Sequence, residues 1–208
     1  MLIQVDVDST LYDADKLFGQ VAEEAGIKWP YNARSWLPAN SLRTFDGEEV
    51  TVEALKRVFR RAHSREYVLQ QTPYKGAAEV LGNLVEEFDE IEIAYVSDRN
   101  EQQSKALEDW LEANDFLHSP DQKVVVSKDK RHWMRQHRPE IVIDDRVRTL
   151  IMARFELGAY GATLEHAHNI NLRGEVEGIF VCKNWREIDS AIREGIFPRI
   201  GTKTMVRV

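Results

Sequence analysis

Short apolar runs of strand length recur along the chain, and segments with helical spacing of apolar residues follow most of them. The runs that predict buried strands are residues 2–7, 91–96, 124–126, 141–143 and 179–182. The segments that predict helices are residues 77–88, 106–111, 131–136, 150–155 and 185–192. Strands that alternate with helices pair in parallel through crossovers, so the pattern predicts an open, doubly wound α/β sheet with helices on both faces.

Residues 13–72 break this alternation of strands and helices. Asp13 can cap a first helix, and the apolar positions of residues 54–62 recur at helical spacing. The stretch is too long for a simple crossover and is mostly helical, so we interpret it as a small cap inserted after the first strand. The expected organisation is a catalytic core of residues 1–12 and 73–198, a helical cap of residues 13–72 and a C-terminal tail of residues 199–208, whose form the sequence leaves open.

Composition narrows the class of protein. The chain has 208 residues, enough for one core and a small subdomain, and 43% hydrophobic with 30% charged residues is typical of a globular protein. A net charge of −7 argues against a nucleic-acid surface, because polyanion binding normally requires a basic face. Cys182 is the single cysteine, and no apolar stretch approaches the ~20 residues of a membrane span. Together with an N-terminus unlike a signal peptide, this predicts a cytoplasmic protein without a membrane partner.

Reactive side chains stand at the ends of four predicted strands. They are Asp6 and Asp8 after the first, Ser97 after the second, Lys130 after the third, and Asp144 with Asp145 after the fourth. The carboxyl ends of parallel strands meet at one edge of a sheet, where such folds bind ligands. The sequence therefore predicts that four carboxylates, one hydroxyl and one ammonium gather at this edge.

Four neighbouring carboxylates raise each other's pKa, and a hard divalent cation such as Mg²⁺ relieves their repulsion. A phosphate can then bind, because the metal and Lys130 neutralise its oxygens while Ser97 donates a hydrogen bond. One carboxylate can attack the phosphorus, and a second one two residues on can act as general acid and base. The pattern thus favours phosphoryl transfer. Any single D-x-D-x-T sequence is weak evidence, and the order and placement of all the motifs carry the prediction.

Four ordered segments carry a family resemblance: Asp6-Val7-Asp8-Ser9-Thr10, Ser97, Lys130 and Ile143-Asp144-Asp145. They resemble the motifs of the haloacid dehalogenase-like (HAD) phosphatases over nearly the whole chain. The resemblance implies a Rossmannoid parallel sheet with an inserted helical cap. It also implies Asp6 as nucleophile, Asp8 as general acid and base, and Ser97 with Lys130 as phosphate ligands.

The same resemblance implies that Mg²⁺ is the cofactor. Its ligands would be Asp6, Asp8 through its carbonyl, and the pair Asp144 and Asp145, and which member of the pair touches the metal stays open. The second Asp of the first motif is typical of phosphatases rather than dehalogenases. Lys128 is the alternative to Lys130 as the lysine of the third motif.

Further segments resemble the 5′(3′)-deoxyribonucleotidase group, namely Pro73-Tyr74-Lys75-Gly76-Ala77, Ser127-Lys128-Asp129-Lys130, Ile143-Asp144-Asp145-Arg146, His168-Asn169 and Asn184-Trp185. This implies a nucleoside or deoxynucleoside 5′-monophosphate as the favoured substrate, with aromatic cap residues stacking on the base. Candidates for that role are Trp29, Trp36, Phe45 and Phe59, of which Trp36 is the chosen substrate ligand. The alternative is that these aromatic residues form the small core of the cap.

The second motif departs from that group, because Ser97 is followed by Asp98-Arg99-Asn100. This version resembles polynucleotide-end (3′) phosphatases, in which the arginine touches substrate. Arg99 and Thr10 are therefore added as substrate-binding candidates. A basic groove would support this alternative, built from Lys128, Arg131, Arg135, Arg138 and Arg146.

A third hypothesis is a non-catalytic nucleotide-binding HAD-like protein. None of the motif acids is missing, which argues against it. The expected partner is a small phosphorylated metabolite, with nucleic acid less favoured and a homodimer left open. His63 is expected to face solvent, and His166 with His168 to form a local hydrogen-bonding feature rather than a zinc site.

Overall fold

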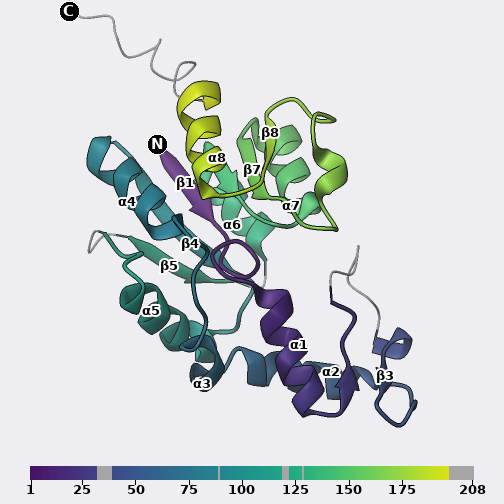
Figure 1. Cartoon of the computed structure of the whole chain (residues 1–208). Helices are drawn as coiled ribbons and strands as arrows, with labels where there is room; N and C mark the ends of the chain where they lie inside the picture. Colours follow the sequence, from purple (N-terminus) through teal and green to yellow (C-terminus); the bar gives the residue numbers. More distant parts are fainter. Residues whose placement is uncertain (32–38, 89, 119–121, 128, 197–208) are drawn as a thin grey trace, which may run out of the picture.

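A six-stranded parallel sheet organises the protein in the computed structural model, which describes residues 1–31, 39–88, 90–118, 122–127 and 129–196 (Figure 1). The strand order is β5-β4-β1-β6-β7-β8, and every neighbouring pair is parallel. The strands are β1 (Leu2–Val5), β4 (Glu92–Ser97), β5 (Lys123–Val126), β6 (Ile141–Ile143), β7 (Tyr160–Leu164) and β8 (Ile179–Cys182). The predicted α/β fold class is confirmed.

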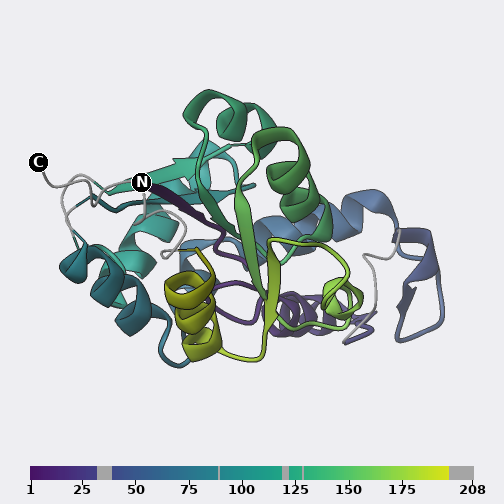
Figure 2. The ribbon, with the colours of Figure 1, turned by 90° about the horizontal axis from the view of Figure 1, so that it is seen from above.

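Helices cover both faces of this sheet, as the view from above shows (Figure 2). The α-helices are α4 (Ala77–Glu87), α5 (Ser104–Ala113), α6 (Lys130–His137), α7 (Val147–Met152) and α8 (Trp185–Ser190). Shorter helical turns are η2 (Glu101–Gln103), η3 (Ala153–Leu157), η4 (Ile170–Leu172) and η5 (Ala191–Ile196). Alternate strand residues face opposite layers: Ile3 and Val5 pack in the core with α4, α5 and α8, whereas Val142 packs with α6 and α7.

The segment between β1 and α4 adds no strand to the main sheet. It holds α1 (Ala14–Glu24), β2 (Ile27–Lys28), η1 (Ala39–Ser41), β3 (Arg43–Thr44), α2 (Val52–Ala62) and α3 (Arg65–Val68). In Figure 1 these elements lie beyond the carboxyl end of β1, and β2 pairs with β3 antiparallel. Their buried residues, such as Phe18 and Val58, belong to the same apolar cluster as Ile3 and Val5. The segment is thus packed onto the sheet, while its boundaries as a separate cap stay a prediction.

Side-chain caps fix where several helices begin. Asp13 accepts a hydrogen bond from the backbone of Lys16, Thr51 from Ala54, Asp129 from His132, and Asn184 from Glu187. Each cap satisfies a backbone N–H that has no partner within its helix. The cap at Asp129 matters for the site, because Lys130 is the first residue of the helix that it starts.

Strand β7 was not predicted. Its sequence includes Gly161 and Ala162, small residues that break the apolar run by which the other strands were found. The small residues have a packing reason, since a Cβ at Gly161 would lie 3.2 Å from the Leu150 side chain and 3.3 Å from that of Ile179. A search of the described helices finds none that combines the length and the apolar character of a membrane span. The predicted tail, residues 199–208, lies outside the described residues.

Candidate active site

The carboxyl edge of the sheet holds Asp6 and Asp144 in fixed positions. The backbone N–H of Asp6 donates to the carbonyl of Ile143 over 2.8 Å, and that of Asp144 donates to the carbonyl of Ala162 over 3.2 Å. These bonds continue the hydrogen bonding between strands by one residue beyond β1 and β6. The two side chains therefore emerge next to each other from neighbouring strands.

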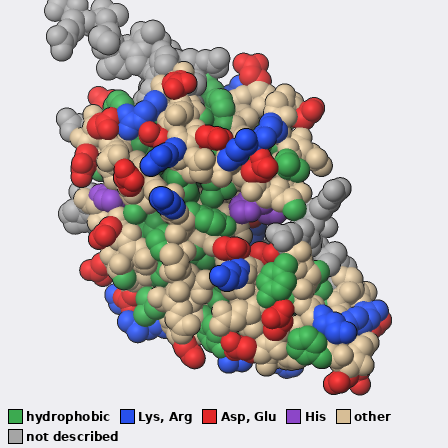
Figure 3. All heavy atoms as spheres, viewed as in Figure 1, with side chains coloured by type: hydrophobic (Ala, Val, Ile, Leu, Met, Phe, Trp, Pro, Cys, Tyr) green, Lys and Arg blue, Asp and Glu red, His purple; other side chains and the backbone are tan. Residues whose placement is uncertain are grey.

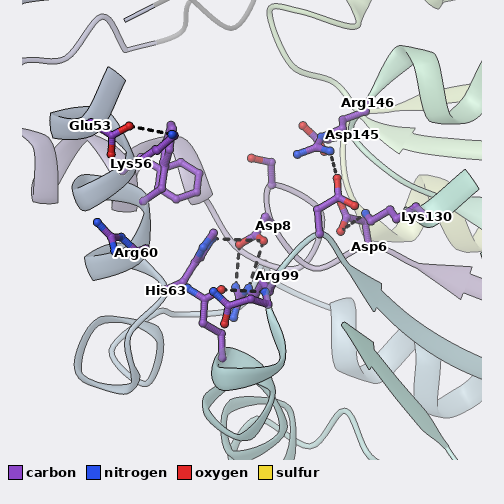
Figure 4. Close-up of a pocket in the computed structure, with 16 residues that line it drawn as sticks. Asp6, Asp8, Glu53, Lys56, Arg60, His63, Arg99, Lys130, Asp145 and Arg146 are labelled. Atoms are coloured by element: carbon purple, nitrogen blue, oxygen red, sulfur yellow. Dashed lines mark hydrogen bonds and ion pairs between the residues drawn. The ribbon is translucent and has the colours of Figure 1, made fainter. Parts of the chain in front are cut away.

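Asp6, Asp144 and Asp145 form a buried carboxylate cluster. One carboxylate oxygen of each lies within 4.8 Å of the others, and each residue is at most 6% exposed. The ammonium of Lys130 contacts two of these carboxylates: its Nζ lies 2.5 Å from Asp6 Oδ1 (Figure 4) and 3.2 Å from Asp144 Oδ2. One ammonium thus faces three carboxylates.

The charge of this cluster is not balanced by the protein. Burial raises the pKa of Asp6 well above its usual range, and the attraction of Lys130 does not offset burial together with the repulsion from Asp144 and Asp145. The pKa of Asp144 is raised for the same reasons, burial first. The pKa of Lys130 is raised as well, because its carboxylate partners outweigh burial. Oxygen-only donors with surplus negative charge suit a hard divalent cation, so the residues fit Mg²⁺.

Asp145 is oriented by the loop that follows β7. Its Oδ2 lies 3.0 Å from His168 Nε2, and this hydrogen bond is the main reason that the pKa of His168 is raised. Its carbonyl accepts a hydrogen bond from the amide of Asn169, which is fully buried and also contacts Leu164 O. His166 bonds the carbonyl of Ser9 instead. Both histidines therefore make hydrogen bonds that position the site.

Asp8 occupies a second, separate group of contacts beside this cluster. Its Oδ1 accepts from Arg99 Nη2 over 2.8 Å and from the Tyr12 hydroxyl over 2.5 Å, and its Oδ2 accepts from the Ser97 hydroxyl over 3.3 Å. His63 Nε2 lies 3.6 Å from Oδ2. Burial alone would raise the pKa of Asp8, but Arg99 and then His63 outweigh it and hold that pKa well below its usual range.

Two cavities open at this edge of the sheet. The first has a volume of about 720 Å³ and reaches from Asp6 and Lys130 to helix α2. The second has about 670 Å³ and is lined by Trp29, Phe59 and other residues of the inserted segment, together with the loop after β7. Asp145 lines both cavities. The carboxylate cluster therefore lies where the two cavities meet.

The structure brings most of the predicted site residues together and separates others. Thr10 lines neither cavity, because it is buried and its carbonyl accepts from the indole of Trp185. Ser9 has a positive φ of 58°, which turns the chain so that Ser9 lines both cavities in its place. Thr10 therefore faces neither cavity in this arrangement, and its contact with substrate stays a prediction. Trp36 and Lys128 lie outside the described residues.

Arg99 lines the first cavity, but its guanidinium is buried against Asp8 rather than extended into open space. The predicted basic groove is not assembled either. Arg131 and Arg135 both pair with Glu156, and Arg146 pairs with Asp98. The face shown in Figure 3 has acidic and basic side chains interspersed. These pairings argue against the polynucleotide alternative.

His63 is the main residue that the sequence analysis misplaced. Its side chain is 15% exposed and contacts Asp8, whereas it was expected to face solvent. It caps the C-terminus of α2, and its chain spacing from the first motif gives no hint of the contact. Tyr12, whose hydroxyl donates to Asp8, was missed as well. Both contacts follow from how the chain packs after the first motif, not from a motif.

Replacing Asp6 by Asn is expected to stabilise the metal-free protein. The raised pKa means that the folded state binds a proton more tightly than the unfolded state, so stability from this group falls as the pH rises through that pKa. In EDTA at pH 8 we expect a gain of about 1 kcal/mol in the free energy of unfolding, or roughly 2–4 °C in the thermal midpoint. The gain should shrink at low pH.

Thermal unfolding in EDTA and in excess Mg²⁺ tests this expectation. Mg²⁺ should raise the midpoint of the parent protein and raise that of Asp6→Asn less, because binding to the folded state stabilises it by mass action. Asp115→Asn, at an exposed position with positive φ that Asn tolerates, is the matched control. If Asp6→Asn instead lowers the thermal midpoint in EDTA, the carboxylate cluster does not carry a destabilising surplus of negative charge.

Comparison with solved structures identifies the fold. A predicted phosphoglycolate phosphatase from Haemophilus somnus 129PT superposes with a TM-score of 0.63 at 14% identity, over 90% of this chain and 95% of that one. A HAD family hydrolase from Deinococcus radiodurans R1, with bound phosphate and sodium, gives 0.59 at 16% identity, over 93% and 95%. CbbY from Rhodobacter sphaeroides, in complex with phosphate, gives 0.60 at 12% identity, over 90% and 95%.

No protein-family model and no curated protein matches the sequence. The resemblance to the deoxyribonucleotidase group therefore stays a prediction, since none of the solved structures named above is described as a nucleotidase. At these identities the likeness concerns the fold. The chain has the HAD-like Rossmannoid α/β fold.

Proposed function

We propose that this protein is a Mg²⁺-dependent phosphomonoesterase that works through an aspartyl-phosphate on Asp6. The observation that carries the proposal is the buried cluster of Asp6, Asp144 and Asp145 around a single lysine, with Asp8 beside it. The fold shared with a HAD family hydrolase and with CbbY, both of which hold phosphate in their solved structures, adds support. Asp6, Asp144 and Asp145 would hold the cation, which when bound supplies positive charge to the phosphate oxygens.

In the first step a carboxylate oxygen of Asp6 attacks the phosphorus, and the bond from phosphorus to the ester oxygen breaks. The leaving oxygen takes a proton from Asp8. Asp8 is ionised in the free site, and the arrival of a phosphate dianion beside it raises its pKa, because a nearby like charge favours the neutral form. Lys130, in contact with Asp6, is placed to neutralise charge on the transferring group.

In the second step water attacks the aspartyl-phosphate and gives its proton to the carboxylate of Asp8. The bond between phosphorus and Asp6 breaks, which releases inorganic phosphate, restores the carboxylate of Asp6 and leaves Asp8 protonated. Asp8 returns this proton, which it took up from solvent when the phosphate bound, as inorganic phosphate leaves and its pKa falls again. The hydrogen bonds from Arg99 and Tyr12 fix the carboxylate of Asp8 for both proton transfers. The sum of the steps is hydrolysis of one phosphomonoester by one water.

Asp6→Asn is expected to abolish turnover. An amide is a poor nucleophile, so kcat for a generic aryl phosphate in Mg²⁺ should fall by roughly 10³-fold or more. The measurement is phosphate release with and without EDTA, with Asp115→Asn as the control that removes a distant carboxylate. Near-normal activity of Asp6→Asn would show that another group attacks phosphorus.

His63→Gln is expected to change the pH dependence of the same activity. Because His63 helps to lower the pKa of Asp8, its loss should let that pKa rise toward the usual value. The acidic limb of the rate profile should then move to higher pH, with kcat reduced by about tenfold or less. His132→Gln, at an exposed position of α6, is the control. An unchanged profile would mean that His63 only packs against the site.

A nucleoside 5′-monophosphate is the favoured substrate within this proposal. The support is the aromatic wall of the second cavity, where Trp29 and Phe59 stand with ring centroids 6.4 Å apart and Phe18 packs 5.0 Å from Phe59. Bases stack on such side chains. Phe45, another candidate, is 56% exposed and lines neither cavity. We therefore assign base contact to Trp29 and Phe59.

Trp29→Ala is expected to remove a preference for nucleotides. In the parent protein, kcat/KM should be greater for thymidine 5′-monophosphate than for ribose 5-phosphate, since stacking contributes about 1–3 kcal/mol per base. Trp29→Ala should lower the ratio of the two kcat/KM values by about tenfold and leave kcat/KM for ribose 5-phosphate unchanged. Phe45→Leu should alter neither kcat/KM value. Equal rates for both substrates in the parent protein would rule out the nucleotide assignment and leave the phosphatase chemistry standing.

A further inference from the structure

We infer that, beside the nucleotides proposed above, the site takes phosphomonoesters that carry a second anionic group, a phosphate or a carboxylate, and that Lys56 and Arg60 of helix α2 bind this group. The inference rests on the proposed function and concerns the far wall of the first cavity. That cavity has Asp6 and Lys130 at one end and α2 at the other. It is large enough to hold a small metabolite, at about 720 Å³.

Helix geometry places the two cations on the wall. Lys56, Arg60 and His63 follow each other at spacings of four and three residues, which puts them on one face of α2. All three line the first cavity. Figure 4 shows Lys56 and Arg60 on the helix that faces Asp6 and Lys130 across this space. The other arginines of α2, Arg57 and Arg61, do not line it.

The remaining basic side chains of the cavity are already committed. Arg99 pairs with Asp8, Lys130 with Asp6 and Asp144, and Arg146 with Asp98. Arg60 is exposed and forms no ion pair with any residue that the structure describes. Its guanidinium offers a fork of donors that matches a carboxylate or a phosphate.

Lys56 has one partner, Glu53, at 2.9 Å. Both side chains are more than 60% exposed, and such pairs contribute little, so the lysine can turn toward a stronger anion. Glu53 also lines the cavity, which leaves the wall with two cations and one anion. A neutral leaving group would gain nothing from this surplus charge.

Phe18 and Phe59 add apolar surface to the lining of the cavity. A ligand that suits this arrangement has a reacting phosphate, a short carbon segment and a second anion. This describes a class of phosphomonoesters and names no particular metabolite. Hydrogen bonds to charged groups are worth more than neutral ones, so losing Arg60 should cost about tenfold in binding.

The test uses simple substrates that differ only in the second anion. Alkyl phosphates with two to six carbons are compared with the matching α,ω-bisphosphates and ω-carboxyalkyl phosphates, in Mg²⁺. For at least one chain length, the parent protein should cleave a substrate with the second anion with a kcat/KM about tenfold greater than that for the alkyl phosphate of equal length. This gain is counted beyond the twofold advantage that a bisphosphate has from its two equivalent phosphates. The two series distinguish a phosphate from a carboxylate as the second group.

Variants then assign the gain to residues. Arg60→Gln and Lys56→Gln should each remove most of the gain in kcat/KM by raising KM for the substrates with a second anion. Neither variant should change kcat/KM for the alkyl phosphates. Arg57→Gln removes the same charge from another side of α2 and should keep the gain. A parent protein that cleaves no phosphate ester would overturn the proposed function. Cleavage without a gain at any length, or a gain that Arg57→Gln lowers as much as Arg60→Gln, would overturn this inference and leave that function intact.

Discussion

The site depends on carboxylates that are buried together with too little positive charge. Asp6, Asp144 and Asp145 lie close enough to hold one cation; the ammonium of Lys130 contacts Asp6 and Asp144, and Asp145 pairs with His168. Buried charges without full compensation destabilise a folded protein, and the raised pKa values of Asp6 and Asp144 express that strain. The rest of the fold has to hold these groups in place against their repulsion. It does so by fixing their backbones to the neighbouring strands.

Two carboxylates of one motif have opposite environments, and this difference assigns their roles. Asp6 lies among other acids and its pKa is raised, whereas Asp8 lies among Arg99, Tyr12 and His63 and its pKa is lowered. Alternate side chains of an extended segment point to the same side, so Asp6 and Asp8 lie opposite Val7, which is buried in the core. The left-handed turn at Ser9 follows directly after Asp8. In the proposed mechanism, this short segment supplies both the nucleophile and the proton carrier.

Much of this could be predicted from the sequence, because strand ends are local features. The apolar runs located five of the six strands, and the polar residues directly after them fall at the carboxyl edge. Strand β7 escaped because Gly161 and Ala162 interrupt its apolar run, and at Gly161 the close side chains of Leu150 and Ile179 leave no room for a larger residue. The position of Ser9 depends on backbone conformation instead, since its positive φ angle accompanies a turn at which Ser9, and not Thr10, lines the cavities.

Contacts between segments far apart in the chain were beyond such reasoning. The pairing of Arg131 and Arg135 with Glu156 removed a basic groove that the sequence suggested, and the packing of α2 created a cationic wall that no motif marked. The same helix ends at His63, which contacts Asp8, and carries Arg60 one turn before it. Any shift of α2 that brings Arg60 onto an anion also moves His63 relative to Asp8. If the two proposals hold, helix α2 links the binding of a second anion to proton transfer at Asp8, and the rate of the chemical step depends on what the leaving group carries at its far end.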